Sequence, residues 1–528
     1  MKEMPSTLTY PGVYIEEIPS GVRTITGVAT SVTAFIGRAM RGPVNEPVTI
    51  NNFGDFERTY GGLWLKSTMS YAVRDFYLNG GSQAVIVRLY HGKIGESPKA
   101  SLKRDELNLV AANEGAWGNH LRMRVDDDVS EDMAKEFGLE VSDLFNLTIR
   151  DMKTGNTEGF RNLTVKESRR QVDLVLENQS ALVRVGGSLP DTPPSAHAEP
   201  EPGHDIWEND TTSTGVATED QGFDGGHLEG NDFIVTNTEN TKTGLYSLEK
   251  ADLFNILCIP PYKTDGNVDS SLVGESANYC EKRRAMLIVD PPSGWSSKDD
   301  AKTGIAAGVG TTSKNSALFF PRLRQPNPLR DNQIEDFAPC GAVAGVFART
   351  DTQRGVWKAP AGLDASLVGV PQLSVPLTDP ENGELNPLGI NCLRAMPAAG
   401  RVIWGSRTLQ GNDRLASEWK YIPVRRVALY IEESLYRGTQ WVVFEPNDEP
   451  LWAQIRLNLG AFMHSLFRQG AFQGTTPKEA YFVKCDKETT TQNDIDRGIV
   501  NILVGFAPLK PAEFVVIKIQ QMAGQIQT

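Results

Sequence analysis

The 528-residue chain has few cysteines and no long hydrophobic run. Its five cysteines are widely spaced and form no CxxC pair, which argues against a disulfide framework and against a zinc site. This cysteine usage fits a protein made in a reducing cytosol. The longest apolar runs, such as Ala428–Ile431 and Phe514–Ile517, are only a few residues long and far too short to cross a bilayer, and no secretory signal is visible. We therefore expect no membrane insertion.

Motifs for catalysis and cofactor binding are also missing. There is no Walker A, GxSxG or HExxH motif, and residues 304–314 have the glycines of a phosphate loop at the wrong spacing. The six histidines are scattered, and the acidic triplet 126–128 lacks the glycine and distal glutamate of a calcium loop. The sequence predicts no catalytic, cofactor-binding or metal site. An enzyme with an α/β core stays open as an alternative, which would need a clustered acid, base or nucleophile.

The net charge of −13 is distributed unevenly along the chain. Residues 92–245 contain 15 Lys/Arg and 29 Asp/Glu, a net charge of −14. Residues 385–528 contain 16 Lys/Arg and 13 Asp/Glu, a net charge of +3. Such asymmetry concerns partners and solubility rather than fold. No basic stripe with interleaved aromatic residues occurs, so we expect no nucleic-acid partner.

The order of predicted elements indicates a mixed α/β, multi-domain protein. Strands and helices alternate over residues 26–91 and again over 246–375, which predicts one α/β domain built from both segments. Residues 92–245 contain mainly polar loops and short strand candidates, which predicts a mostly β insertion domain. Pro, Asp and Asn are frequent over residues 371–389, and we place a domain boundary there, with a C-terminal domain over 385–510.

The C-terminal domain has the clearest helical patterns. A helix is predicted from Pro423 to Gly438, because apolar residues recur on one face and proline suits a first turn. A longer helix is predicted over residues 447–469, ending at Gly470. Strands are predicted at Tyr481–Cys485 and Ile499–Phe506. Arg425 and Arg426 begin the first helix, where the dipole end is already positive, and they indicate an exposed face or a contact with an acidic protein.

Both chain ends are predicted to be isolated strands on proline-containing linkers, an N-terminal arm over residues 1–25 and a C-terminal arm over 511–528. A lone strand leaves backbone N–H and C=O groups unpaired, so each arm must join a sheet of its own chain or the sheet edge of a neighbour. On the residues alone the local pairing is the more common solution. The strand residues are Val13, Tyr14, Ile15, Glu16, Ile18, Phe514, Val515, Val516, Ile517, Lys518 and Ile519.

Several short motifs along the chain resemble one known family, the contractile tail sheath proteins of phages, R-type pyocins and extracellular contractile injection systems. Residues 186–245 carry no such resemblance. The motifs are Tyr10–Glu17, Thr33–Gly37, Phe53–Phe56, Phe76–Gly81, Ala116–Asn119, Val343–Asp351, Gly355–Gly362, Gly389–Asn391, Trp404–Thr408, Tyr421–Tyr436 and Phe444–Asn447.

The resemblance implies that the arms of one subunit join strands in the C-terminal domains of neighbouring subunits. It further implies that the C-terminal domain lies inside, against an inner tube, and that the acidic insertion lies outside. The tube contact is expected on the helix that begins with Arg425 and Arg426, with the helix over residues 447–469 as the second candidate.

The implied function is that of a structural subunit. It would polymerise with itself as stacked hexameric rings around an inner tube, between a baseplate and a terminal cap protein, and contract from a metastable extended state to drive the tube through a target envelope. It would be made in the bacterial cytoplasm, need no cofactor, and become part of a phage tail or of a phage tail-like particle released from the cell. A static shell or surface-layer protein is the alternative.

Overall fold

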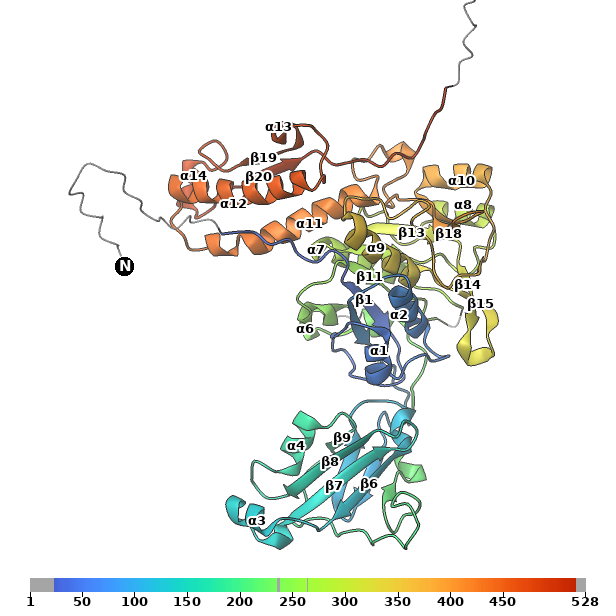
Figure 1. Ribbon diagram of the computed structural model, residues 1–528, viewed down its shortest axis with the longest axis vertical. Helices are drawn as coiled ribbons and strands as arrows, with labels where there is room; N and C mark the ends of the chain where they lie inside the picture. Colours follow the sequence, from blue (N-terminus) through green and yellow to red (C-terminus); the bar gives the residue numbers. More distant parts are fainter. Residues whose placement is uncertain (1–22, 235–237, 264, 519–528) are drawn as a thin grey trace, which may run out of the picture. The chain divides into compact units, whose positions relative to one another are not determined.

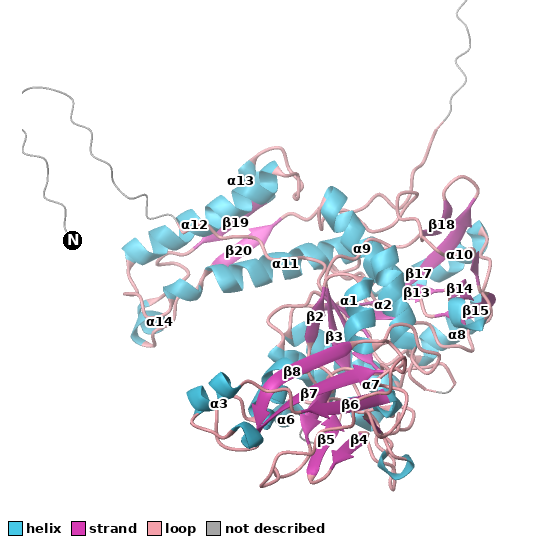
Figure 2. Ribbon diagram, turned by 60° about the horizontal axis from the view of Figure 1, so that its bottom comes forward, coloured by secondary structure: helices cyan, strands magenta, loops and turns pink. Residues whose placement is uncertain are grey.

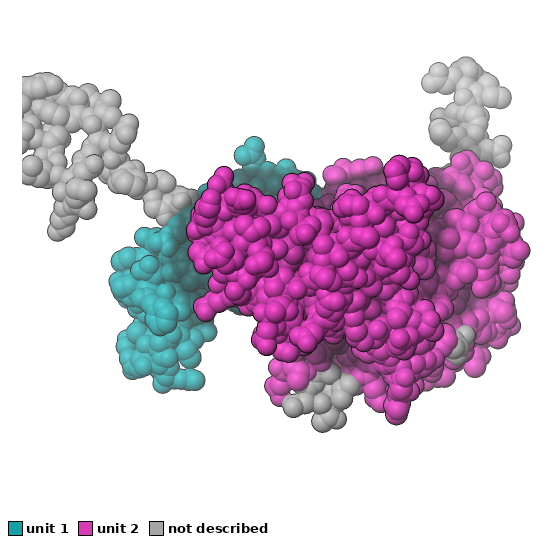
Figure 3. All heavy atoms as spheres, turned by 90° about the horizontal axis from the view of Figure 1, so that it is seen from below, with its two compact units in different colours: residues 1–29, 355–357, 426–528 teal, residues 30–354, 358–425 magenta. Residues whose placement is uncertain are grey.

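The computed structural model describes residues 23–234, 238–263 and 265–518. It is a mixed α/β structure whose contacts separate the chain into two compact units (Figure 3). The larger unit comprises residues 30–354 and 358–425, and the smaller comprises residues 1–29, 355–357 and 426–528. Within the described residues, no helix is long and apolar enough to cross a membrane.

An eight-stranded sheet forms the middle of the larger unit, in the order β18-β17-β13-β12-β11-β1-β3-β2. The strands from β17 to β3 run parallel, and antiparallel β18 and β2 form the edges. The bounds are β1 (Thr33–Gly37), β2 (Val48–Ile50), β3 (Ala84–Arg88), β11 (Ile256–Cys258), β12 (Met286–Val289), β13 (Ser316–Phe320), β17 (Ile390–Met396) and β18 (Gly400–Ile403).

Helices cover both faces of this sheet, which explains why its inner strands are apolar on both sides. Along β1, Ala34 and Ile36 face one core and Phe35 faces the other. The first core includes residues of α7 (Ser270–Lys282), α8 (Lys298–Ala307) and α10 (Asp379–Leu385). The second core includes residues of α1 (Phe53–Tyr60), α2 (Thr68–Leu78) and α9 (Cys340–Arg354).

Helices α2 and α9 pack unusually closely, and two glycines of α9 make this possible. A Cβ atom at Gly341 would lie 2.0 Å from the Ala72 carbonyl oxygen, and one at Gly345 would lie 2.5 Å from the Phe76 carbonyl oxygen. Any larger residue at these two positions would force the helices apart. The buried face of α9 therefore depends on the Gly-x-x-x-Gly spacing.

The insertion has a hydrophobic core of its own. Its strands form two sheets, β10-β6-β7-β8 and β4-β5-β9. The elements are β4 (Ser101–Arg104), β5 (Leu107–Ala111), β6 (Leu121–Asp126), α3 (Glu131–Phe137), β7 (Leu144–Asp151), β8 (Thr157–Thr164), α4 (Val172–Gln179), β9 (Val183–Val185) and β10 (Thr214–Gly215). The short helices α5 (Gly230–Phe233) and α6 (Thr238–Thr241) follow, and Phe233 of α5 packs in the first core of the central sheet instead.

Two buried arginines join the insertion to the α/β sheet. Arg88, at the end of β3, donates to the carbonyl oxygens of Ala39, Gly42 and Glu114 at 3.0, 2.7 and 2.8 Å. Arg38 donates to the carbonyl oxygens of Asp224 and Gly225 at 2.8 and 3.0 Å. Each side chain therefore bonds to backbone beyond residue 92, which fixes the insertion at its base.

A small sheet of β14 (Leu323–Asn327), β15 (Gln333–Phe337) and β16 (Gln372–Leu373) completes the larger unit. Strand β14 lies between the other two and pairs with both in antiparallel register. The hairpin of β14 and β15 has exposed apolar residues near its tip, Leu329 and Ile334.

The smaller unit is built on α11 (Ile422–Gly438), most of which belongs to it, and α12 (Glu449–Arg468). Helix α12 runs beside the two-stranded sheet of β19 (Tyr481–Lys484) and β20 (Leu503–Phe506) (Figures 1 and 2). Two short helices, α13 (Pro477–Ala480) and α14 (Gln492–Asp496), complete this unit. Its core contains the apolar stripe predicted for α12, including Trp452, Ile455 and Leu459.

The expected start of the C-terminal domain at residue 385 is wrong. Strand β17 pairs with β13 in parallel register, from Ile390 opposite Leu318 onward, and therefore belongs to the central sheet. The smaller unit resumes at Arg426. The proline-rich stretch resembles a linker in composition, yet Val375, Leu377 and Leu385 are buried in the α/β core.

Candidate functional site

The C-terminal arm exposes a continuous apolar segment. Phe514, Val515, Val516 and Ile517 are 76–81% exposed, and Lys518 is exposed as well. Over residues 511–518 the backbone forms no strand, although the pattern predicts one. The physical reason is that a β-strand exists only when its backbone is hydrogen-bonded to a neighbouring strand. This segment pairs with none of the described strands. Ile519 lies outside the described residues.

The N-terminal arm can be followed from its root. Val13, Tyr14, Ile15, Glu16 and Ile18 lie outside the described residues, whereas the next segment packs on the smaller unit. The Arg23 backbone N–H donates to Asn458 Oδ1 at 3.1 Å, and the Arg23 guanidinium lies 4.6 Å from the centroid of the Trp441 ring. Ile25 is 7% exposed in the same core. The arm is thus attached to α12 and to the turn that follows α11.

The sheet of β19 and β20 is incomplete by ordinary standards. Two strands alone are marginally stable, and the described residues supply no third strand to either edge. Its inward residues, such as Tyr481 and Val504, pack on the core, while Phe482 and Leu503 point outward and are 48% and 52% exposed. The Phe482 ring also covers Gly505 on the opposite strand, where a Cβ atom would lie 2.2 Å from it.

Arg425 and Arg426 are not on an exposed face, contrary to the sequence-based expectation. They are 5% and 4% exposed. Arg425 Nε donates to Asn315 Oδ1 at 2.8 Å, and its guanidinium lies 4.8 Å from the centroid of the Trp419 ring. These two partners offset the free-energy cost of burying the guanidinium charge. Arg425 therefore anchors the start of α11 within its own chain. Reversing it would test folding rather than partner binding.

Helix α12, the second candidate for the tube contact, has one exposed face along its length. Its exposed residues recur every three or four positions, and Leu457 is the largest apolar residue among them, 52% exposed. A Cβ atom added at Gly460 would contact no other atom within 4 Å. The exposed face consists of Ala453, Gln454, Leu457, Ala461, His464, Ser465 and Arg468.

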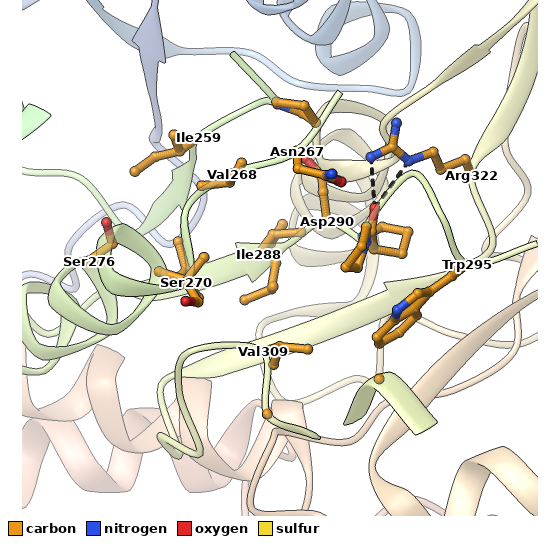
Figure 4. Close-up of a pocket in the computed structure, with 18 of the residues that line it drawn as sticks. Ile259, Asn267, Val268, Ser270, Ser276, Ile288, Asp290, Trp295, Val309 and Arg322 are labelled. Atoms are coloured by element: carbon orange, nitrogen blue, oxygen red, sulfur yellow. Dashed lines mark hydrogen bonds between the residues drawn. The ribbon is translucent and has the colours of Figure 1, made fainter. Parts of the chain in front are cut away.

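A cavity of about 250 Å³ lies at the carboxyl ends of β11 and β12 (Figure 4), the edge at which doubly wound sheets commonly bind ligands. Among the described residues that line it, Asp290 is the only carboxyl group, and there is no histidine, cysteine or lysine. Asp290 Oδ1 accepts a hydrogen bond from the Cys340 backbone N–H at 2.9 Å, and burial raises the pKa of Asp290 to about 6.

The other charged group of this cavity, the guanidinium of Arg322, is hydrogen-bonded to the backbone. Arg322 donates from two nitrogens to the Pro291 carbonyl oxygen, at 3.1 and 2.9 Å (Figure 4). The lining therefore lacks the pair of acid and base, or of nucleophile and base, on which side-chain catalysis depends. Among the described residues, no cluster of three or more His, Cys, Asp or Glu could hold a metal ion.

Sequence patterns missed the exposed apolar residues that these surfaces share. Phe482, Leu503 and Leu457 all lie in elements that the patterns predicted, yet exposure depends on which neighbours cover a residue. One signal was available in Tyr481–Lys484: side chains alternate along a strand, so Phe482 lies on the face opposite to Tyr481 and Val483.

Comparisons with known proteins match this chain to phage tail sheath proteins. The family model of the phage tail sheath protein central domain matches residues 236–409, and that of the phage tail sheath C-terminal domain matches residues 416–522. A prophage major tail sheath protein of Pseudomonas aeruginosa is 26% identical over 282 residues, which are 52% of this chain and 67% of that protein. The tail sheath protein of Enterobacteria phage T4 is 26% identical over 174 residues, which are 31% of this chain and 24% of that protein.

Solved sheath proteins share the fold. The sheath of an extracellular contractile injection system, PVC, in its contracted state has a TM-score of 0.58 and 21% identity, covering 98% of both chains. The sheath tail protein of Listeria innocua has a TM-score of 0.59 and 14% identity, covering 92% of this chain and 96% of that one. The two matched family domains together span more than half of the sequence, so the chain belongs to the phage tail sheath family and is a subunit of a contractile tail sheath.

Proposed function

We propose that copies of this chain join into a sheath by exchanging their two arms. The observation that carries the proposal is the coexistence of an exposed apolar segment, Phe514–Ile517, with a two-stranded sheet that has no third strand among the described residues. Strand addition would bury the former and complete the latter. The arms over Val13–Ile18 and Phe514–Ile519 would lie along the two edges of β19 and β20 in neighbouring copies.

The energy of this exchange is sufficient to link subunits. A six-residue strand is about 20 Å long, and about five ladder hydrogen bonds contribute roughly 1 kcal/mol each. Burial of the apolar side chains on one face of the arm would add about 1.5–3 kcal/mol per side chain. Since every subunit would both give and receive arms, the links could persist while subunits rotate and slide during contraction.

Contraction would release energy that was stored at assembly. Subunits would be placed as stacked hexameric rings around an inner tube in a metastable extended state, with a baseplate and a terminal cap protein at the ends. New contacts between subunits in the shorter state would then drive the tube through a target envelope. We propose that these contacts supply the work, so that no catalysis by this chain is needed.

The tube contact is proposed for the exposed face of α12, because the side chains of Arg425 and Arg426 are buried. Leu457 is the central apolar residue of that face. Leu457→Glu should leave the chain folded, since the side chain is half exposed, and should weaken assembly that is templated by the tube. Leu174→Glu is the matched control, because Leu174 lies on α4 of the insertion and is also 52% exposed, and this variant should assemble normally on the tube. Unchanged tube-templated assembly of Leu457→Glu would place the contact elsewhere.

The place of synthesis and the place of action follow from this function. We propose that the chain is made in the bacterial cytoplasm and becomes part of a phage tail or of a released phage tail-like particle. The acidic insertion, with a net charge of −14 over residues 92–245, would face the solvent on the outside.

Deletion of the arms tests the proposal. Chains that lack residues 1–19 or 510–528 should remain folded, because Phe514–Lys518 are exposed and because the shortened N-terminus keeps the contacts of Arg23 with the smaller unit. They should fail to polymerise under conditions in which the full chain forms sheaths, as seen by electron microscopy and sedimentation. Normal sheaths from either shortened chain would contradict the arm exchange.

A further inference from the structure

The turn between α11 and α12 presents a fully exposed aromatic side chain on a strained backbone. Phe444 is 103% exposed and its neighbour Val443 is 63% exposed. Phe444 has a φ angle of +71°, in the left-handed region that bulky residues rarely adopt. Both features are unfavourable in an isolated chain, since the ring is left in water and the backbone conformation opposes it.

The surrounding contacts hold this turn in place. The Glu445 backbone N–H donates to the Val442 carbonyl oxygen at 3.1 Å. Asn447 Nδ2 donates to the Ile499 carbonyl oxygen at 3.0 Å, and Trp452 Nε1 donates to Asn447 Oδ1 at 2.9 Å. The first bond closes the turn itself, and the other two connect its C-terminal side to α12 and to the segment before β20. The position of Phe444 is therefore set by its neighbours rather than by its own side chain.

The turn also adjoins the root of the N-terminal arm. The Arg23 guanidinium lies over the ring of Trp441, three residues before Phe444, and the Arg23 backbone is bonded to Asn458 of α12. The described part of the chain begins at Arg23, beside this turn. In the proposed exchange, residues 13–18 bind to a second copy, and the few residues between them and Arg23 would keep that copy close to Val443 and Phe444.

We propose that the turn of Val443 and Phe444 is a contact between two copies of this chain, in which the Phe444 ring is buried against the second copy. The inference rests on the proposed arm exchange and adds a second, separate contact beside it. The strain at Phe444 would be retained because only that backbone conformation turns the ring outward. A contact with the inner tube instead is the competing outcome.

Phe444→Gly separates the two roles of this residue. Glycine adopts positive φ angles readily, so the soluble chain should unfold at the same or a higher temperature than the native chain. Self-assembly without tube protein should require at least tenfold more protein, because burying a fully exposed Phe side chain contributes at least that factor to an association constant. Phe444→Tyr, which keeps the ring, should assemble normally.

Ala416→Gly is the matched control. Ala416 also has a positive φ angle, +47°, but carries no ring to bury. It should equally preserve or raise the unfolding temperature and leave assembly unchanged. Loss of assembly in Ala416→Gly would show that relief of backbone strain alone impairs the sheath, which would overturn the inference.

Three other results would overturn it. The first is full assembly of Phe444→Gly at the concentrations at which the native chain assembles. The second is failure of this variant only when tube protein is present. The third is unfolding of the variant several degrees below the native chain. The last result would mean that the ring packs within its own chain. If deletion of residues 1–19 leaves assembly intact, the exchange of the N-terminal arm fails. If that deletion blocks assembly and Phe444→Gly does not, only the present inference fails.

Discussion

Proline substitutions in the C-terminal arm test whether its backbone forms ladder hydrogen bonds. Successive N–H groups of a strand point to opposite edges, so Val515→Pro and Val516→Pro remove donors on opposite sides. If the arm pairs along one edge, one of the two variants should be much the more damaging. If it pairs along both edges, both should be.

The expected size of the effect follows from the lost bond. Removing one donor sacrifices about 1 kcal/mol and leaves a buried carbonyl oxygen without a partner, which costs a further 1–2 kcal/mol or so. A loss of about 2–3 kcal/mol per subunit corresponds to a rise of roughly 30- to 150-fold in the concentration needed for assembly. The soluble chain should lose almost no stability, because Val515 and Val516 are 81% and 79% exposed.

The assay is sedimentation of assembled sheaths over a range of protein concentrations, with unfolding of the soluble chain measured in parallel. Ala512→Pro is the control, since it stiffens the arm before the predicted strand without removing a ladder donor. Equal assembly of the native chain, Val515→Pro and Val516→Pro would refute the reasoning, because no strand addition tolerates proline at both positions.

Three further predictions concern the fold. Gly345→Ala should lower the stability of the larger unit by about 1–3 kcal/mol in chemical unfolding, because the added Cβ atom would lie 2.5 Å from the Phe76 carbonyl oxygen. In the control Gly460→Ala the added Cβ atom has no other atom within 4 Å, and this variant should raise helix stability by up to about 1 kcal/mol. Asp290→Asn should stabilise the chain at pH 7 by up to about 3 kcal/mol, because burial raises the pKa of Asp290 to about 6 and ionisation therefore opposes folding. The gain in the free energy of unfolding should fade as the pH falls from 6 to 4, and a gain that is independent of pH would contradict this origin. Burial lowers the pKa of His197 to about 4, so the unfolded chain takes up a proton first and the insertion should lose stability as the pH falls from 6.5 to 4; His197→Gln should flatten that dependence in unfolding curves.

Amphipathic and parallel-strand patterns predicted many of the elements correctly. The stripe of α12 follows from its helical period. Strands β1, β3 and β12 are buried on both faces, and their short continuous apolar runs are typical of inner strands of a parallel sheet. Helix α9 was not predicted as a helix. Its residues from Cys340 to Ala348 are all buried, so no polar face exists to reveal the helical period.

The site was predictable only where local sequence decides it. The apolar run at Phe514–Ile517 indicated a strand in need of a partner, and it is exposed in the chain. Arg425 was misjudged because its burial depends on Asn315 and Trp419, of which Asn315 lies more than 100 residues away in sequence. The strained backbone at Phe444 could not be predicted from the sequence, since no local pattern indicates a positive φ angle at phenylalanine.

The exchange of arms between copies is tested most directly by a cryo-EM map of the assembled sheath at a resolution that traces the backbone. The account predicts that residues 514–519 of one copy and residues 13–18 of another each form a strand beside β19 or β20 of a third chain, giving a four-stranded sheet. A map in which both ends fold back onto their own subunit, with no strand crossing between subunits, would contradict it.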